Sequence, residues 1–314
     1  MSTLHPQVAA LLDAVKASRI PPMHTVPAAE ARRIYRDTRG RLLPPAPQMA
    51  LCEDLPIPGP AGKIPVRHYR PAGSVAGQKL PALLFFHGGG WVIGDLDTHD
   101  VLCRELSNGA GCTVIAIDYR LAPEHRFPAA VDDSIAAMRH FVQRAADYAF
   151  DATRVAVGGD SAGGNLATVV ALAARDAGYP PLAYQLLIYP GTDQRMRHAS
   201  HAANGAGYLL TRELIEYFRG HYLPDAKQYD DWRASPLLAK DLSGLPPAYV
   251  LTAGFDPLVD EGKAYAQRLA AAGVKVEYRC YEDMVHGFIL MGGVLDTARL
   301  AVADCAERLK RAFA

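Results

Sequence analysis

The chain has 314 residues, of which 50% are hydrophobic and 21% are charged, which is enough apolar material for one large α/β domain with an appendage. Basic and acidic residues both number 33, so the formal net charge is zero and a nucleic-acid partner is disfavoured. No apolar run approaches the roughly 20 residues that cross a bilayer, and the first residues lack the basic and apolar segments of a secretory signal. We therefore expect a cytoplasmic protein that spans no membrane.

The cysteines are odd in number and scattered along the chain. They are Cys52, Cys103, Cys112, Cys280 and Cys305. This distribution favours reduced, buried thiols over a disulfide framework or a metal site.

Two helical segments precede any strand. Apolar residues fall at helical spacing over residues 8–15, and a second helical stretch, 28–35, follows Pro27. The proline- and glycine-rich residues 56–62 then predict a turn between two edge strands at the start of a sheet.

From residue 80 onward, short apolar strands alternate with helices. The predicted strands are 82–86, 113–117, 155–157, 185–189, 248–252 and 276–281. The predicted helices are 131–144, 166–174, 261–272 and 297–313. Strands that are apolar throughout and separated by helices indicate a mainly parallel sheet covered on both faces, which is an α/β core.

The polar residues 191–231 interrupt this alternation and include a helix that starts near Thr211. The segment follows a strand, so it projects from the edge where α/β sheets place their active sites. We therefore predict a catalytic core of residues 51–190 and 232–314. Residues 191–231 form an inserted cap segment, and residues 1–50 form the N-terminal part of the same cap.

A glycine-flanked serine directly follows one buried strand. In the run Gly159–Gly163 the central residue is Ser161, and an apolar helix comes next. Glycines on both sides permit a sharp turn that exposes the hydroxyl above a helix N-terminus. A G-x-S-x-G run also occurs by chance, and glycine-rich turns also bind phosphates. The glycines do not have the G-x-G-x-x-G spacing of a dinucleotide-binding site, however. The chain also lacks the Gly-Lys-Ser or Gly-Lys-Thr of a Walker phosphate-binding loop.

A triple glycine follows the strand over residues 82–86. Gly88, Gly89 and Gly90 lie between His87 and Trp91. Their backbone N–H groups can approach a substrate oxygen without a side chain in between, so two of them, with the amide of Ala162, predict an oxyanion hole. The alternative is a flexible turn.

An acid and a base for the serine can be sought at the ends of later strands. Asp256 follows the strand over 248–252, and His286 follows the strand over 276–281. The chain order serine, aspartate, histidine favours these two as orienting acid and base. Asp260 is an alternative acid, although Asp260 and Glu261 also suit the start of the next helix, where negative charge is favourable.

These motifs together resemble the bacterial hormone-sensitive-lipase-like esterases. The matching runs are His87–Trp91, Asp118–His125, Gly159–Gly164, Asp256–Leu258 and His286–Phe288. The resemblance covers roughly residues 50–314. It implies an α/β-hydrolase fold with a helical cap and the hydrolysis of short to medium acyl esters, with Ser161, Asp256 and His286 as nucleophile, acid and base. No metal or organic cofactor is implied, and a homodimer through the last strand is possible for the family.

Two positions in these motifs have other interpretations. We expect Arg120 and Glu124 to form a buried ion pair that braces the loops. Asp160, next to the serine, has no assigned role at this stage.

Two rival functions remain. Plant hormone receptors that resemble this family keep the pocket and lose the histidine, which is present here as His286. Cleavage of amides or peptides would need departure of a poorer leaving group than an alcohol. The acyl length, the enantioselectivity and the natural substrate stay open, because they depend on cap side chains.

Overall fold

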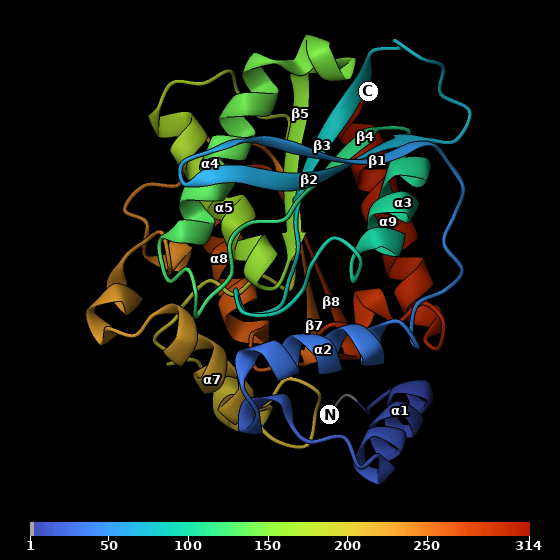
Figure 1. Cartoon of the computed structure of the whole chain (residues 1–314). Coiled ribbons are helices and arrows are strands. Elements are labelled where there is room, and N and C mark those ends of the chain that lie inside the picture. Colours follow the sequence, from blue (N-terminus) through green and yellow to red (C-terminus); the bar gives the residue numbers. More distant parts are fainter. Residues whose placement is uncertain (1–2) are drawn as a thin grey trace.

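The computed structural model describes residues 3–314, and in this part of the chain one sheet of eight strands forms the centre (Figure 1). The strands are β1 (Met49–Gly59), β2 (Gly62–Pro71), β3 (Leu80–Phe86), β4 (Thr113–Ile117), β5 (Phe150–Asp160), β6 (Tyr184–Ile188), β7 (Ala248–Phe255) and β8 (Val276–Val285). Their order across the sheet is β1-β2-β4-β3-β5-β6-β7-β8. The pairs β1–β2 and β2–β4 are antiparallel and the other five are parallel. The mostly parallel sheet predicted from the apolar runs is confirmed.

The edge strand β1 is longer than the proline-rich sequence suggested. It continues through Pro56, which pairs with Pro65 of β2, so the turn is limited to residues 59–62. The predicted turn over 56–62 is therefore wrong in its first half. Proline is tolerated here because an edge strand leaves alternate N–H groups without a partner strand.

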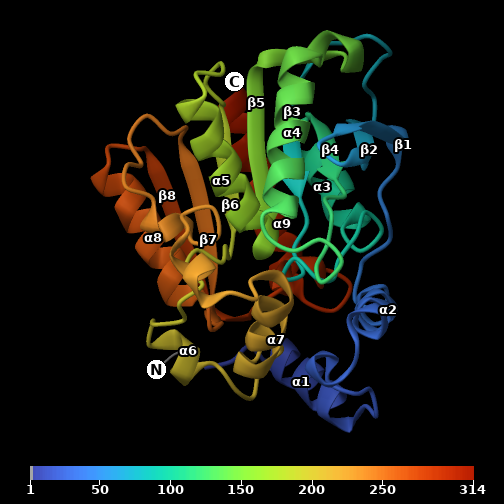
Figure 2. The same ribbon diagram turned by 60° about the vertical axis from the view of Figure 1, so that its left-hand side comes forward.

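Helices cover both faces of the sheet (Figures 1 and 2). One face carries α3 (Asp100–Ala110) and α9 (Asp296–Phe313), and the other carries α4 (Ala129–Gln143), α5 (Ala162–Asp176) and α8 (Val259–Ala271). Each face has its own hydrophobic cluster, and β3 and β4 between them are buried along their whole length. The four helices predicted after residue 80 overlap α4, α5, α8 and α9.

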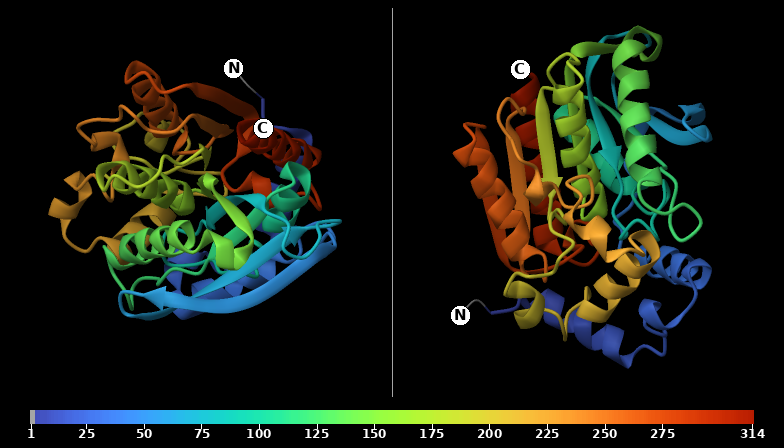
Figure 3. Two further views of the ribbon diagram at one scale, coloured as in Figure 1. Left: turned by 90° about the horizontal axis from the view of Figure 1, so that it is seen from above. Right: turned by 90° about the vertical axis from the view of Figure 1, so that its left-hand side faces the viewer.

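A group of short helices lies beyond the carboxyl ends of the parallel strands (Figures 2 and 3). It comprises α1 (Pro6–Ala17), η1 (Met23–Thr25), α2 (Ala28–Arg39), α6 (Ser200–Ala203), α7 (Arg212–Tyr222) and η3 (Ala226–Asp230). The hydroxyl of Tyr217 in α7 donates to the Val26 carbonyl at 3.0 Å, which joins the inserted segment to the N-terminal segment. The division into a core and a two-part cap stays our proposal.

The remaining short turns of 3-10 helix are η2 (Ala145–Tyr148), η4 (Pro236–Leu238) and η5 (Phe288–Leu290). Within residues 3–314, none of the helices combines the length and the apolar character that a bilayer crossing requires. The five cysteines are free, and three of them are buried, but Cys280 is half-buried and Cys52 is exposed. The expectation of burial is therefore wrong for these two thiols.

The predicted ion pair between Arg120 and Glu124 is wrong. Arg120 instead makes two 2.8 Å hydrogen bonds to Asp133 of α4, whose side chain is 1% exposed. Glu124 is 52% exposed and pairs with Arg32 of α2 at 2.6 Å. A separation of four residues brings side chains together on a helix, but residues 118–128 form a loop. Each side chain therefore contacts a different helix.

Candidate active site

Ser161 lies on a sharp turn between β5 and α5. Its backbone has φ 55° and ψ −117°, a strained conformation for a residue with a side chain. A Cβ atom at either Gly159 or Gly163 would overlap the carbonyl oxygen of Phe86 on β3. The two glycines therefore let the turn press against the neighbouring strand, and α5 begins at Ala162 with its N-terminus directly at the serine.

The structure brings Asp256 and His286 to this serine from two other strands. His286, which follows β8, places Nε2 2.9 Å from Ser161 Oγ and Nδ1 2.6 Å from Asp256 Oδ2. Asp256 follows β7, is fully buried, and accepts a 2.8 Å hydrogen bond from the Leu258 amide through its other oxygen. Because β5, β7 and β8 are parallel members of one sheet, the residues that follow them meet at the same edge.

The alternative acid, Asp260, lies in the first turn of α8 and accepts a 2.9 Å hydrogen bond from the Ser200 amide. Glu261, also in that turn, is 1% exposed and lies 2.8 Å from His201 Nε2. It also accepts a 2.6 Å hydrogen bond from the Thr192 amide. Burial raises the pKa of Glu261, although His201 acts in the opposite direction. Both carboxylates thus attach the segment after β6 to α8.

The three glycines after β3 differ in what their amides contact. The Gly88 N–H donates to Asp160 Oδ1 at 2.8 Å and is therefore occupied. Gly89 (φ 123°) and Gly90 (φ 60°) line the pocket beside Ser161, and within the described chain their amides donate to no acceptor. Ala162, the first residue of α5, lines the same pocket. Of the four predicted oxyanion donors, Gly89, Gly90 and Ala162 are available.

Asp160 connects the serine turn to the glycine loop. Its side chain is buried and lies 3.1 Å from His99 Nε2 as well as 2.8 Å from the Gly88 amide. Burial acts to raise the pKa of Asp160, but the charge and hydrogen bond of His99 together with the Gly88 amide hold this pKa below its usual value. On the other side of the loop, the Tyr119 hydroxyl donates to the His87 carbonyl at 2.6 Å. The loop is therefore held from two directions.

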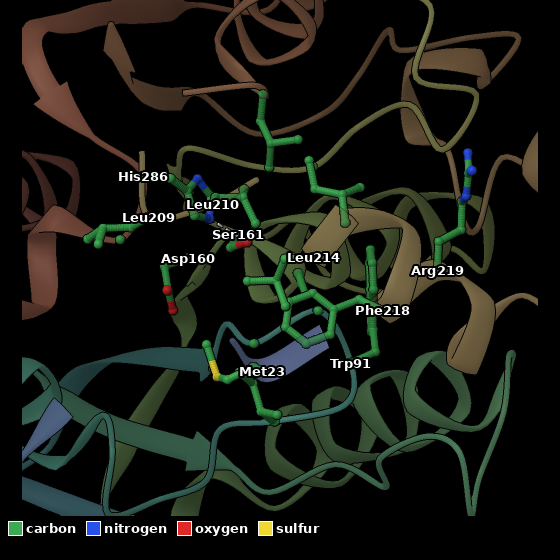
Figure 4. A pocket seen from close by; sticks show the side chains of 18 of the residues that line it. Met23, Trp91, Asp160, Ser161, Leu209, Leu210, Leu214, Phe218, Arg219 and His286 are labelled. Atoms are coloured by element: carbon green, nitrogen blue, oxygen red, sulfur yellow. Dashed lines mark hydrogen bonds between the residues drawn. The ribbon is translucent and has the colours of Figure 1, made fainter. Parts of the chain in front are cut away.

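An apolar pocket opens in front of Ser161 (Figure 4). Much of its apolar lining comes from η1, from the loop after β3, and from the segment that ends in α7: Met23, Trp91, Ile93, Leu209, Leu210, Leu214, Ile215 and Phe218. Helix α7 begins after Thr211, whose hydroxyl caps the Leu214 amide at 3.3 Å. Leu214 and Phe218 are four residues apart and therefore share the helix face that lines the pocket.

Sequence reasoning missed two features of the site, one behind the serine and one in the pocket. His99, just before α3, gave no sign that it would contact the carboxylate next to the serine, because 61 positions of chain separate the two. Arg39, at the end of α2, lines the pocket with Ser161 although its segment carries no motif. Both placements depend on how loops return over the sheet edge.

Comparison with known proteins agrees with this geometry. A family model described as the alpha/beta hydrolase fold matches residues 83–290. The chain is 51% identical to the carboxylic ester hydrolase LipN of Mycobacterium tuberculosis. The match covers 78% of this chain and 66% of LipN, so the chain spans just under two thirds of the length of that protein. It is 40% identical to an ethyl acetate hydrolase of Pseudomonas putida, over 98% of this chain and 99% of the relative.

Solved structures give the same result. The crystal structure of a serine-to-alanine variant of LAE6, an alpha/beta hydrolase enzyme from the metagenome of Lake Arreo in Spain, matches with a TM-score of 0.96 at 45% identity. The match covers 100% of this chain and 99% of LAE6. Together with the motifs, these comparisons confirm the resemblance, and the chain belongs to the α/β-hydrolase esterase family.

Proposed function

We propose that this chain hydrolyses carboxylic esters with short to medium acyl groups, through Ser161 as nucleophile, His286 as base and Asp256 as the orienting acid. The observation that carries the proposal is the continuous contact from Asp256 through His286 to the Ser161 hydroxyl, at 2.6 and 2.9 Å. Hydrogen-bond reach between nucleophile, base and orienting group is what serine hydrolysis requires.

In the first half of the reaction, Ser161 attacks the ester carbonyl carbon while His286 Nε2 takes the hydroxyl proton. Asp256 accepts a hydrogen bond from the Nδ1–H group of His286 and stabilises the positive imidazolium that forms. The negative oxygen of the tetrahedral intermediate accepts hydrogen bonds from the amides of Gly89, Gly90 and Ala162, the donors left free in the structure. His286 then gives its proton to the leaving alcohol oxygen, and an acyl-enzyme remains. Water attacks the acyl carbon by the same sequence and releases the acid.

Both segments of the proposed cap contribute apolar side chains to the pocket. The apolar residues Met23, Leu214 and Phe218 come from the N-terminal and inserted segments and line the pocket in front of Ser161 (Figure 4). The similarity to a protein named ethyl acetate hydrolase also supports small ester substrates. A cytoplasmic location and a homodimer through β8 remain predictions.

The test compares Ser161→Ala with wild type on 4-nitrophenyl esters of increasing acyl length. We expect wild type to show a burst of one nitrophenolate per active site, with the highest kcat/KM at short to medium chains. Ser161→Ala is expected to lose about 10⁴-fold or more of kcat, as nucleophile removal does in other serine hydrolases. Ser18→Ala, at an exposed helix end, is the control and should match wild type. Retention of about one per cent of wild-type turnover by Ser161→Ala, or a preference for long acyl chains, would contradict the proposal.

A further inference from the structure

Helix α2 carries four arginines, and one of them has no partner of opposite charge. The other three form ion pairs with carboxylates at 2.6 Å: Arg32 with Glu124, Arg33 with Glu30 and Arg36 with Asp95. Within the described chain, Arg39 forms no ion pair with a carboxylate, and its Nη1 atom is buried without a hydrogen-bond partner. An unsatisfied donor on a charged group is costly, so the position calls for an acceptor.

Arg39 belongs to the lining of the pocket of Ser161, close to the proposed catalytic base. Arg39 and Tyr35 both line that pocket. The Arg39 Nη2 atom packs against Gly287, where a Cβ would lie 2.9 Å from it, and Gly287 directly follows His286. The guanidinium carbon lies 5.1 Å from the centroid of the Tyr35 ring. The ring and the end of α2 are favourable for a positive charge, and the Tyr35 side chain is hydrogen-bonded to the Arg39 guanidinium, but Nη1 itself has no acceptor.

The other charged side chains that line the pocket have partners of their own. The partners are His99 at 3.1 Å for Asp160, Arg195 at 2.8 Å for Asp193, His201 at 2.8 Å for Glu261 and the Gln194 carbonyl at 2.9 Å for Arg219. Arg219 also lies well away from His286 in Figure 4. Arg39 therefore brings the uncompensated positive charge to the part of the pocket beside the base.

The position next to Gly287 determines which part of an ester Arg39 meets. In the proposed reaction His286 gives its proton to the leaving alcohol oxygen, so the alcohol part lies on the His286 side of the scissile bond. We propose that Arg39 binds a carboxylate on the alcohol part of the substrate, so that the chain prefers esters of hydroxy acids over neutral esters. This inference rests on the proposed ester hydrolysis. The planar guanidinium suits a carboxylate, and the Tyr35 hydroxyl is a second polar group at the same wall.

Two acetyl esters that differ in charge alone test the proposal. O-acetyl lactate carries a carboxylate on the alcohol part, and O-acetyl lactamide replaces this group by a neutral amide of the same shape. Hydrolysis of both is followed by acid release for wild type, Arg39→Gln, Arg39→Lys and the control Arg33→Gln. Arg33 belongs to the same helix but is 62% exposed and outside the pocket. Monoethyl succinate, with its carboxylate on the acyl part, is a third probe.

We expect wild type to favour O-acetyl lactate over the lactamide. Arg39→Gln should lower kcat/KM for O-acetyl lactate by about 10-fold to 100-fold, the usual range for a lost charged hydrogen bond, mainly through a higher KM. The lactamide should change by less than about 3-fold, which also shows that the variant is folded, since Arg39 makes no charged contact with a neutral substrate. Arg39→Lys should retain part of the preference, and Arg33→Gln all of it.

Three results would overturn this inference. The first is an equal loss of kcat/KM on both acetyl esters in Arg39→Gln, and the second is a wild type that does not prefer the anionic ester. The third is a loss of kcat/KM in Arg39→Gln that is confined to monoethyl succinate, which would place the carboxylate on the acyl side. In each case the proposed ester hydrolysis stands as long as wild type turns over O-acetyl lactamide. Failure of wild type on every ester would instead refute the proposed function.

Discussion

Asp160 is expected to control catalysis without touching the substrate, because it holds the glycine loop in place. Its Oδ1 atom accepts a hydrogen bond from the Gly88 amide at 2.8 Å and lies 3.1 Å from His99 Nε2, and the side chain is 4% exposed. Asp160→Ala removes both contacts at once and leaves the Gly88 amide with only its longer, 3.3 Å hydrogen bond to His99 Nε2. The next two amides along the loop, those of Gly89 and Gly90, are then free to move away from the substrate oxygen.

The size of the effect follows from these contacts. Loss of one oxyanion donor costs about 2.7 to 4 kcal/mol, or 10²-fold to 10³-fold in kcat. We therefore expect kcat of Asp160→Ala to fall by roughly 10²-fold with little change in KM. The free energy of unfolding should fall by about 1.5 to 3 kcal/mol, because a buried hydrogen bond to a charged group is lost. Asp160→Asn keeps an acceptor oxygen for Gly88 and should lose roughly 10-fold or less in kcat. His99→Gln, which leaves the Gly88 bond in place, should affect stability more than kcat.

The assay combines steady-state kinetics on 4-nitrophenyl butyrate with the affinity for a trifluoromethyl ketone, which forms a tetrahedral adduct with the serine. If Asp160 positions the oxyanion donors, the affinity for the ketone should fall across the variants in proportion to kcat/KM. Full ketone affinity in a variant with reduced kcat would refute the reasoning, and so would wild-type kcat in Asp160→Ala.

The other predictions concern stability. Burial raises the pKa of Asp118 to about 6 from its usual 3.8. The native state therefore binds this proton more tightly than the unfolded state does. The stability that the bound proton contributes is present below about pH 4 and is lost as the pH rises through 6. Asp118→Asn should therefore raise Tm at pH 8 and raise it much less at pH 4, and an equal gain at both pH values would contradict this. Arg120→Met leaves its carboxylate partner, which is 1% exposed, without a counter-charge and should cost about 3 to 5 kcal/mol in urea unfolding. The exposed ion pair broken by Glu124→Gln should cost less than about 1 kcal/mol, so similar losses in the two variants would refute the argument from burial.

The strands and the three proposed catalytic residues were predictable because their signals are local. An apolar run such as β4 (Thr113–Ile117) is buried on both faces, and the structure has it with the predicted bounds. Ser161, Asp256 and His286 each follow such a strand, and parallel strands of one sheet bring the residues after them to one edge. The sequence pattern therefore predicted their meeting without any knowledge of the loops.

The contacts that depend on loops were decided by the tertiary structure alone. The sequence analysis expected Arg120 and Glu124 to pair with each other, but in the structure each contacts a different helix. Nothing local marks His99 as the partner of Asp160, or Arg39 as part of the pocket. Periodicity and glycine placement report the conformation of a few neighbouring residues, whereas a side-chain contact between distant segments depends on how the chain returns across the sheet. The sequence by itself thus determined the fold class and the proposed catalytic triad, and the tertiary structure decided what surrounds them.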